Sequence, residues 1–156
     1  MLTLEIPGHK TITAEHLVLD YNGTLAVDGR MIDGVAQLLK ELSKQVSIHV
    51  LTADTFGSVK ENVGTLNFKL LIMNQLEQDI AKETYILSLG KESVIAIGNG
   101  MNDVLMLDKA GLSIMIVQAE GACAKLFGVS DIVCTSVIDA LGLLLNPLRV
   151  VATLRK

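Results

Sequence analysis

The sequence is poor in aromatic residues, which make up 3% of its 156 residues and include no tryptophan. A core of this composition has to be built from Leu, Val, Ile, Ala and Met side chains. Few aromatic rings are available to stack on bases, and the formal net charge of −4 leaves no basic footprint for a phosphate backbone. We therefore predict no nucleic-acid partner.

Cysteines and long apolar runs are also scarce. Cys123 and Cys134 form no metal-ligand pattern, so we predict that both are small core residues in a reducing compartment. No run reaches the roughly 18 apolar residues that a membrane span needs. Residues 1–10 lack the basic and long apolar parts of a signal peptide. These features predict a cytoplasmic protein with no membrane partner.

The remaining composition is that of a globular chain, because half of the residues are hydrophobic and 19% are charged. Its length suits one domain with a substantial core, so we predict a single domain over residues 1–156.

Short apolar runs alternate with helical patterns, which indicates a parallel sheet with crossover helices. We predict a three-layer, doubly wound α/β fold of the Rossmann-like type without a large cap domain, preceded by a hairpin of 2–6 with 11–15. The predicted strands are 17–20, 47–52, 68–73, 93–97, 112–117 and 131–134. The predicted helices are 32–44, 55–63, 76–89, 103–109, 121–127 and 136–145.

Polar residues follow three of these strands at their carboxyl ends. Asp20 ends the first, Thr52 to Asp54 the second, and Gly98 to Asp103 the fourth. Each group alone could cap a turn or a helix. Ligands of doubly wound sheets bind beyond the carboxyl ends of the strands, so the three groups together favour a binding or catalytic site.

Four motifs occur in order: "DYNGT" at 20–24, "LTAD" at 51–54, Lys82, and "GNGMND" at 98–103. This set resembles the motifs of the haloacid dehalogenase-like superfamily of phosphatases and phosphotransferases. Its nearest match there is the phosphorylation domain of P-type ATPases. The likeness covers residues 17 to 137, and it suggests a soluble, capless relative of that domain.

The resemblance implies that Asp20 is a nucleophile that forms an aspartyl-phosphate, a covalent intermediate that divides one difficult step into two. It also implies Mg²⁺ as cofactor, since hard oxygen ligands suit this ion. The implied catalytic residues are Asp20, Asn22, Thr52 and Lys82. The implied phosphate-binding residues are Gly23, with a backbone N–H as donor, Thr52, Ala53, Lys82 and Asn102. The implied metal ligands are Asp20, the Asn22 carbonyl, Asn99 and Asp103.

Two amides depart from the family pattern. Asn22 replaces the aspartate that serves phosphatases of this superfamily as general acid and base, a function commonly worth about 10²–10⁴ in rate. An amide cannot titrate, so Asn22 favours donors whose leaving group is stable as an anion, such as ADP or a carboxylate. Asn99 replaces a metal-binding aspartate and removes one negative charge, so we expect weaker metal affinity than in a typical relative.

The spacing of the motifs leaves no room for a cap or a nucleotide-binding domain. Residues 25–51 suffice for a flap with Asp28-Gly29 as its turn and for one helix. We expect an open site that binds a phosphorylated small molecule or nucleotide, with a second subunit or a partner protein as its cover. The missing nucleotide domain weighs against ATP as donor, whereas Asn22 favours it.

Two alternatives stay open at this stage. The two amides could mark a non-catalytic regulatory domain that binds phosphate or a partner, although Asp20, Thr52, Lys82 and Asp103 all remain and favour catalysis. A flavodoxin-like or receiver domain shares the sheet but fits "GNGMND" poorly.

Overall fold

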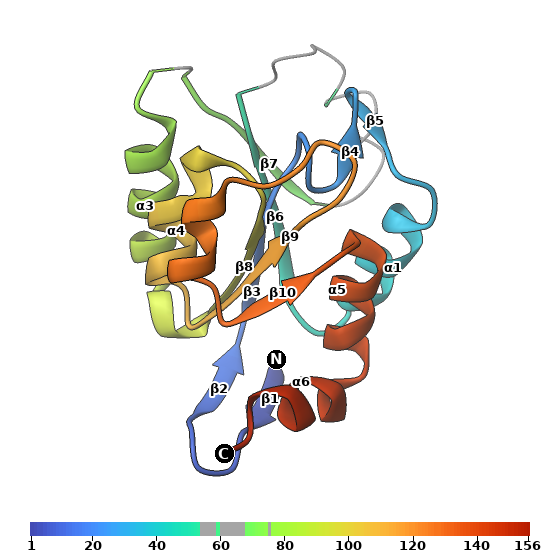
Figure 1. Ribbon diagram of the computed structural model, residues 1–156, viewed down its shortest axis with the longest axis vertical. Helices are drawn as coiled ribbons and strands as arrows, with labels where there is room; N and C mark the ends of the chain where they lie inside the picture. The colour runs from blue at the N-terminus through green and yellow to red at the C-terminus, as the bar shows by residue number, and fades with distance from the viewer. Residues whose placement is uncertain (54–58, 60–67, 75) are drawn as a thin grey trace.

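A parallel six-stranded sheet lies between two layers of helices in the computed structural model, which describes residues 1–53, Val59, 68–74 and 76–156 (Figure 1). The predicted α/β fold is thereby confirmed. The strands, in spatial order, are β10 (Ile132–Cys134), β9 (Leu112–Ile116), β8 (Val94–Gly98), β3 (His16–Asp20), β6 (Ser47–Thr52) and β7 (Lys69–Ile72).

The strand order reverses between β3 and β8. From β3 the chain builds β6 and β7 on one side, and then crosses to build β8, β9 and β10 on the other. β8 and β9 are buried along their whole length, as expected for strands covered by helices on both faces. The carboxyl ends of β3 and β8 therefore meet at the point where doubly wound sheets bind ligands.

Helices α1 (Val35–Leu42) and α5 (Val137–Leu145) pack together on one face of the sheet, and α3 (Gln78–Leu89) and α4 (Val104–Lys109) on the other (Figure 1). α1 turns Val35, Leu39 and Leu42 toward the core at helical spacing. α5 begins at Ser136, whose hydroxyl accepts the backbone N–H of Asp139 as an N-cap. Each helix thus covers the sheet with an apolar face.

Two antiparallel hairpins flank the sheet. β1 (Leu2–Glu5) pairs with β2 (Thr11–Ala14), as predicted, and α6 (Pro147–Leu154) packs on β1 near both chain ends (Figure 1). The flap consists of β4 (Ala26–Val27) and β5 (Arg30–Met31). Its turn residues Asp28 and Gly29 have φ values of 51° and 76°, the left-handed pair that a two-residue type I′ hairpin requires.

The structure corrects two expectations. The segment predicted as helix 121–127 forms a 3₁₀ turn, η3 (Ala124–Gly128), and its first residues are not helical, since Gly121 has a φ of 74° and Cys123 is extended. A further helix, α6, follows α5 and begins at Pro147. Cys123 is only partly buried, whereas Cys134 lies in the core as predicted. Asp54 and the predicted helix 55–63, apart from Val59, lie outside the described residues.

Within the described part of the chain, no single helix is long and apolar enough to cross a membrane. α5 and α6 meet the criterion only as a pair, with a bend of 101° between them.

Candidate active site

Three charged side chains from distant parts of the sequence meet at the carboxyl end of the sheet. Lys82 on α3 places its Nζ 2.6 Å from Oδ1 of Asp20 and 2.6 Å from Oδ1 of Asp103. Asp20 ends β3, and Asp103 lies in the 3₁₀ turn η2 (Met101–Asp103) that follows β8. Lys82 and Asp103 are completely buried, and Asp20 is 6% exposed. The order of the motifs had predicted this convergence, against the usual exposure of a helical lysine.

Burial, followed by the repulsion from Asp103, raises the pKa of Asp20 to about 7, although Lys82 acts in the opposite direction. Burial alone would lower the pKa of Lys82, but the two carboxylates together raise it above its ordinary value. One ammonium thus faces two carboxylates in a region of low dielectric. When both carboxylates are ionised, the arrangement carries one excess negative charge, which a further cation would offset.

Asp103 also organises the loop that follows β8. Its Oδ2 accepts the backbone N–H groups of Asn99 at 3.0 Å and Gly100 at 2.9 Å. A Cβ on Gly98 would lie 2.6 Å from Cγ of Asp103, so glycine is required for this close approach. The carboxylate therefore holds the loop on one side and Lys82 on the other.

Gly23 allows the two catalytic loops to touch. Its φ is 79°, and a Cβ would lie 2.2 Å from Nδ2 of Asn99. Asn99 donates from Nδ2 to the carbonyl of Gly121 at 3.1 Å. The Gly23 N–H, which we expected to face a phosphate, instead donates to the carbonyl of Ala26 at 2.8 Å. The loop folds back between Asn22 and Ala26, which pairs this N–H within the loop.

The Asn22 side chain contains a buried oxygen, Oδ1, that has no hydrogen-bond partner among the described residues. An unpaired buried acceptor is costly and points to a donor or cation that binds there. Asn22 lies two residues beyond Asp20, the last residue of β3, with Tyr21 between them. Tyr21 is completely buried and packs in the core, as expected for a position without a chemical role.

The other predicted phosphate-binding residues are Thr52, Ala53 and Asn102. Thr52 is buried at the end of β6, one residue beyond Leu51, which is the partner of Asp20 in the strand register. Ala53 follows it. Asn102 donates from Nδ2 to Oε1 of Gln78 at 2.8 Å and so connects η2 to the start of α3. The structure thus gives Asn102 a partner in the protein, which the sequence did not suggest.

The oxygen atoms at this site fit a hard divalent cation such as Mg²⁺. Asp20, Asn99 and Asp103 offer carboxylate and amide oxygens, and the expected ligand at position 22 is the backbone carbonyl of Asn22, whose side-chain Oδ1 is the buried acceptor described above. No group of three or more His, Cys, Asp or Glu residues that could hold a metal occurs among the residues described. The site is therefore poorer in carboxylates than a dedicated metal site, in line with the replacement at Asn99.

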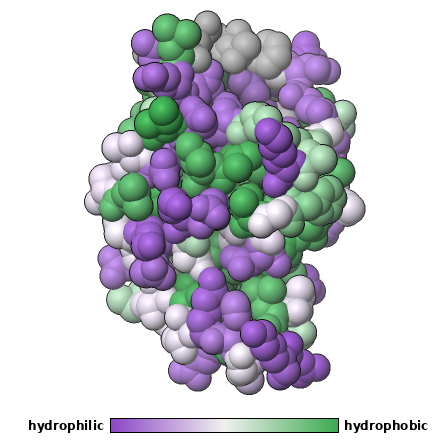
Figure 2. Space-filling model, turned by 60° about the vertical axis from the view of Figure 1, so that its left-hand side comes forward, coloured by the Kyte–Doolittle hydropathy of each residue, from purple (hydrophilic) through white to green (hydrophobic). Residues whose placement is uncertain are grey.

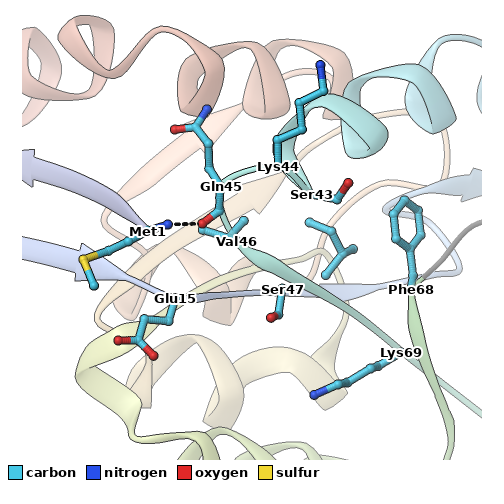
Figure 3. A pocket seen from close by; sticks show the side chains of 10 residues that line it. Met1, Glu15, Ser43, Lys44, Gln45, Val46, Ser47, Phe68 and Lys69 are labelled. Atoms are coloured by element: carbon cyan, nitrogen blue, oxygen red, sulfur yellow. Dashed lines mark hydrogen bonds between the residues drawn. The ribbon is translucent and has the colours of Figure 1, made fainter.

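A separate cavity of about 630 Å³ lies at the other end of the sheet (Figure 3). Its lining includes Glu15, Ser47 and Lys69, which stand at the amino ends of β3, β6 and β7. The amino group of Met1 donates to the carbonyl of Gln45 at its edge (Figure 3). Because this cavity opens at the amino ends of the strands, it is distinct from the cluster around Asp20.

The face formed by α3, α4 and η3 mixes polar and apolar side chains in small groups (Figure 2). Exposed apolar residues of these elements and of the neighbouring η2 are Ile80, Leu87, Met101 and Phe127. Met101 lies close to Cys123, with 3.9 Å between their sulfur atoms.

Two residues of the site were not predicted from the sequence. The Thr24 hydroxyl lies 3.3 Å from Oδ2 of Asp20 and 3.2 Å from Oδ1 of Asn99. Gln118, two residues beyond β9, donates to the carbonyls of Gly23 and Thr24. A polar residue just after an apolar strand was the signal used for Asp20 and Asn99, and the same signal could have found Gln118.

A doubly wound sheet with a buried aspartate at the end of its first core strand, paired with a lysine and a second aspartate, is the arrangement expected of a hydrolase that acts on phosphate. A family model described as haloacid dehalogenase-like hydrolase matches residues 77–136. The chain belongs to this family.

Two proteins of Methanocaldococcus jannaschii are similar to parts of this chain. Protein MJ0073 of Methanocaldococcus jannaschii is 46% identical over 82 residues, which cover 50% of this chain and 88% of that protein. Protein MJ0072 of the same organism is 44% identical over 39 residues, which cover 25% of this chain and 89% of that protein.

Solved structures with the same fold include phosphatases. The cobalt-bound deoxy-D-mannose-octulosonate 8-phosphate phosphatase of Haemophilus influenzae aligns with a TM-score of 0.72 at 17% identity, covering 86% of this chain and 89% of that one. The corresponding enzyme of Moraxella catarrhalis, in complex with magnesium, phosphate and KDO, aligns with a TM-score of 0.65 at 17% identity, over 86% and 87% of the chains. A putative phosphatase of the same name from Vibrio cholerae has a TM-score of 0.71 at 17% identity, over 96% and 97%.

Proposed function

We propose that this protein is a divalent-metal-dependent phosphohydrolase that forms an aspartyl-phosphate on Asp20. The observation that carries the proposal is the buried contact of Lys82 with both Asp20 and Asp103. A buried cluster of one lysine and two aspartates is a poor source of stability. Carboxyl groups with strongly shifted pKa values occur preferentially at functional sites.

The proposed reaction has two steps. The Asp20 carboxylate attacks phosphorus, a P–O bond of the aspartyl-phosphate forms, and the bond to the leaving group breaks with its electron pair. Water then attacks phosphorus, and the P–O bond to Asp20 breaks with its electron pair returning to the carboxylate. Both protons of the water leave with the product as dihydrogen phosphate. Lys82 offers its ammonium to the transferred oxygens, with the Thr52 hydroxyl as a further donor.

A Mg²⁺ ion would be held by Asp20, the Asn22 carbonyl, Asn99 and Asp103, and when bound it would neutralise charge between carboxylate and phosphate. Asp20 must be ionised to attack, and its pKa of about 7 shows how strongly the cluster alone disfavours that charge. The excess negative charge around Lys82 supports a cation at this place.

The proposed donors have good leaving groups. Asn22 cannot protonate an alkoxide, so acyl phosphates, phosphoanhydrides and aryl phosphates are preferred over alkyl esters. This preference sets the protein apart from the sugar-phosphate phosphatases that share its fold, and it motivates the comparison with the P-type ATPase phosphorylation domain. The substrate is a phosphorylated small molecule or nucleotide, and we expect a second subunit or a partner protein over the open site.

Trapping of the phosphoenzyme tests the mechanism. The protein is incubated with Mg²⁺ and acetyl phosphate, quenched in acid and analysed by intact-protein and peptide mass spectrometry. We expect an acid-stable, base-labile phosphate adduct on Asp20, absent from Asp20→Asn. A protein that hydrolyses p-nitrophenyl phosphate without any adduct on Asp20 would exclude the covalent mechanism.

The leaving-group preference has its own test. Asn22→Asp restores a titratable group, and we expect it to raise the hydrolysis of alkyl phosphates by about 10²-fold or more. Hydrolysis of p-nitrophenyl phosphate, whose leaving group needs no proton, should change by less than about 10-fold. An equal change for both substrates would show that Asn22 does not limit ester hydrolysis.

A second candidate is a phosphate-binding regulatory domain without turnover. The amides at positions 22 and 99 favour it, since both replace carboxylates that relatives use. It predicts that calorimetry detects phosphate binding in the presence of Mg²⁺ while no donor is hydrolysed.

A further inference from the structure

Gln118 contacts the loop that follows the proposed nucleophile and the first residue of α5, although nothing in its motif context assigns it a role. It lies in the loop after β9 and is half-buried. Its Nε2 donates to the carbonyl of Gly23 at 3.1 Å and to the carbonyl of Thr24 at 2.7 Å. Its Oε1 accepts the backbone N–H of Val137, the first residue of α5, at 3.0 Å.

We propose that Gln118 is a positioning residue for phosphoryl transfer: its side-chain amide fixes the loop that connects Asp20 to the flap. The inference rests on the proposed function, because it assigns Gln118 to the geometry of that reaction. A primary amide suits this position because it has two N–H groups for two carbonyls and one oxygen for an N–H. A glutamate side chain has no N–H to donate to the two carbonyls. A methionine side chain has no donor, and its sulfur is only a weak acceptor.

The loop needs such a fixation because its inner hydrogen bonds converge on a single atom. The carbonyl of Tyr21 accepts the N–H groups of Thr24, Leu25 and Ala26 at 3.2, 2.8 and 3.0 Å. Two other carbonyls of the loop, those of Gly23 and Thr24, are paired from outside it by the side-chain amide of Gln118. Without it, the peptide groups that follow Gly23 and Thr24 lose these partners on their outer side.

Two groups of the reaction depend on the position of this loop. The Thr24 hydroxyl reaches both Asp20 and Asn99, and the preceding Asn22 is the expected source of a metal-binding carbonyl. Catalytic groups have to be held within about 0.5 Å of their working positions, and supporting hydrogen bonds commonly change metal affinity or activity by about 10–100-fold. The loss of Gln118 should therefore weaken both metal binding and turnover.

The same loop holds the flap through a second residue. Glu120 accepts the backbone N–H of Asp28 at 2.8 Å through Oε1, and both side chains are exposed at this contact. Gln118 and Glu120 thus connect one loop to the nucleophile loop and to the flap respectively. Because the Glu120 contact does not reach Asp20, Glu120→Ala separates the effect of the flap from that of the nucleophile loop.

The test compares Gln118→Met and Gln118→Glu with the wild type and with Gln37→Met. Gln37 is exposed on α1 and serves as the matched control. For p-nitrophenyl phosphate at saturating Mg²⁺, we expect kcat to fall about 10–100-fold in both Gln118 variants, with KM changed less than about threefold. Calorimetric titration with Mg²⁺ should show a dissociation constant about 10-fold higher. Gln37→Met should match the wild type in both measurements.

Gln118→Glu keeps the size of the side chain and the acceptor for Val137, so it remains informative if Gln118→Met does not fold. A folded Gln118 variant with wild-type kcat and Mg²⁺ affinity, and only a lower melting temperature, would overturn the inference and leave Gln118 as a loop-closing residue. An inactive wild type that forms no adduct on Asp20 would overturn the proposed function and the inference together. An active wild type with unaffected variants overturns the inference alone.

Discussion

Two buried polar networks lie under the same helix, α3, and they differ in charge. One turn after Lys82, Tyr85 places its hydroxyl 2.8 Å from Nδ1 of His49, and Nε2 of His49 lies 3.1 Å from Nδ1 of His16. His49 is completely buried in β6, and burial, followed by the charges of His16 and Lys69, lowers its pKa to about 4. This network is neutral at pH 7, whereas the cluster at Asp20 is charged.

Both contacts of the neutral network can be hydrogen bonds. If His49 carries its proton on Nε2, it donates to Nδ1 of His16 and accepts from Tyr85; if it carries the proton on Nδ1, it donates to Tyr85 and accepts from a protonated Nδ1 of His16. Matched tautomers of the two rings thus make both contacts hydrogen bonds. The charged cluster is different, because two carboxylates share one lysine and the Asn22 oxygen lacks a partner among the described residues. Buried polar groups that are fully paired specify a fold, and those left incomplete mark the place where a ligand acts.

The largest effect is expected for Asp20→Asn, which removes the proposed nucleophile from the charged cluster. Turnover of p-nitrophenyl phosphate should fall at least about 10³-fold. Stability should not fall with it. The raised pKa of Asp20 means that the folded state prefers the protonated form, so stability is lost as pH rises from about 4 to about 7.

At pH 8 the Asp20→Asn protein should therefore melt at or above the temperature of the wild type, as measured by calorimetry. A large loss of stability together with activity would mean that Asp20 holds the fold and would remove the contrast between the two networks.

Lys82→Met should have the next largest effect, now on stability. It leaves Asp20 and Asp103 buried together without a cation, a change that commonly costs about 3–5 kcal/mol. Urea unfolding at pH 8 measures it. Lys69→Met, on the exposed edge strand, is the control and should change stability by less than about 0.5 kcal/mol.

The double variant Lys82→Met/Asp103→Asn removes one of the stranded charges and should recover part of the loss. If the double variant is no more stable than Lys82→Met, the aliphatic part of the Lys82 side chain, and not its charge, supports the core.

The sequence predicted the charged cluster better than the neutral one. Asp20 and Asn99 follow apolar strands within ordered motifs, so their convergence follows from parallel pairing alone. The contact of His49 with Tyr85 depends on the rotation of α3 against the sheet, which no motif records. Gln118 was missed because its partners are backbone groups, which have no sequence signature.

The predicted boundaries of helices and strands were likewise correct in some places and wrong in others. The strand 47–52 is observed with the predicted limits, and the β-branched Ile48, Val50 and Thr52 alternate along it. The segment 121–127 was assigned wrongly because its composition suits a helix, whereas Gly121 is left-handed, Cys123 is extended and the residues after them form a 3₁₀ turn. Backbone conformation thus decided an element that side-chain patterns could not.

A smaller effect is expected from acid on the neutral network. The pKa of His49 is lowered from 6.5 to about 4, so the unfolded chain binds more protons and stability is lost as pH falls from about 6.5 toward 4. Between pH 7 and 4.5 this loss amounts to about 2–3 kcal/mol. The contribution of Asp20 has the opposite sign over much of this range, so only a difference between variants is informative.

Urea unfolding of wild type and His49→Gln at both pH values isolates the histidine. We expect the stability of the wild type to fall by about 2–3 kcal/mol more than that of His49→Gln. His9→Gln, on the exposed hairpin, should behave like the wild type. Parallel pH profiles for all three proteins would show that His49 does not couple folding to protonation.

The smallest effect is expected for Tyr85→Phe, which removes the hydroxyl at the end of the neutral network. Nδ1 of His49 then loses its partner at 2.8 Å, and the loss of one such hydrogen bond costs about 1 kcal/mol. Thr84→Val, at the neighbouring exposed position of α3, is the control. Turnover should stay within about twofold of the wild type, because Tyr85 contacts none of the groups around Asp20. A loss of turnover much larger than twofold at unchanged stability would mean that the two networks communicate along α3, and that the neutral one also serves the reaction.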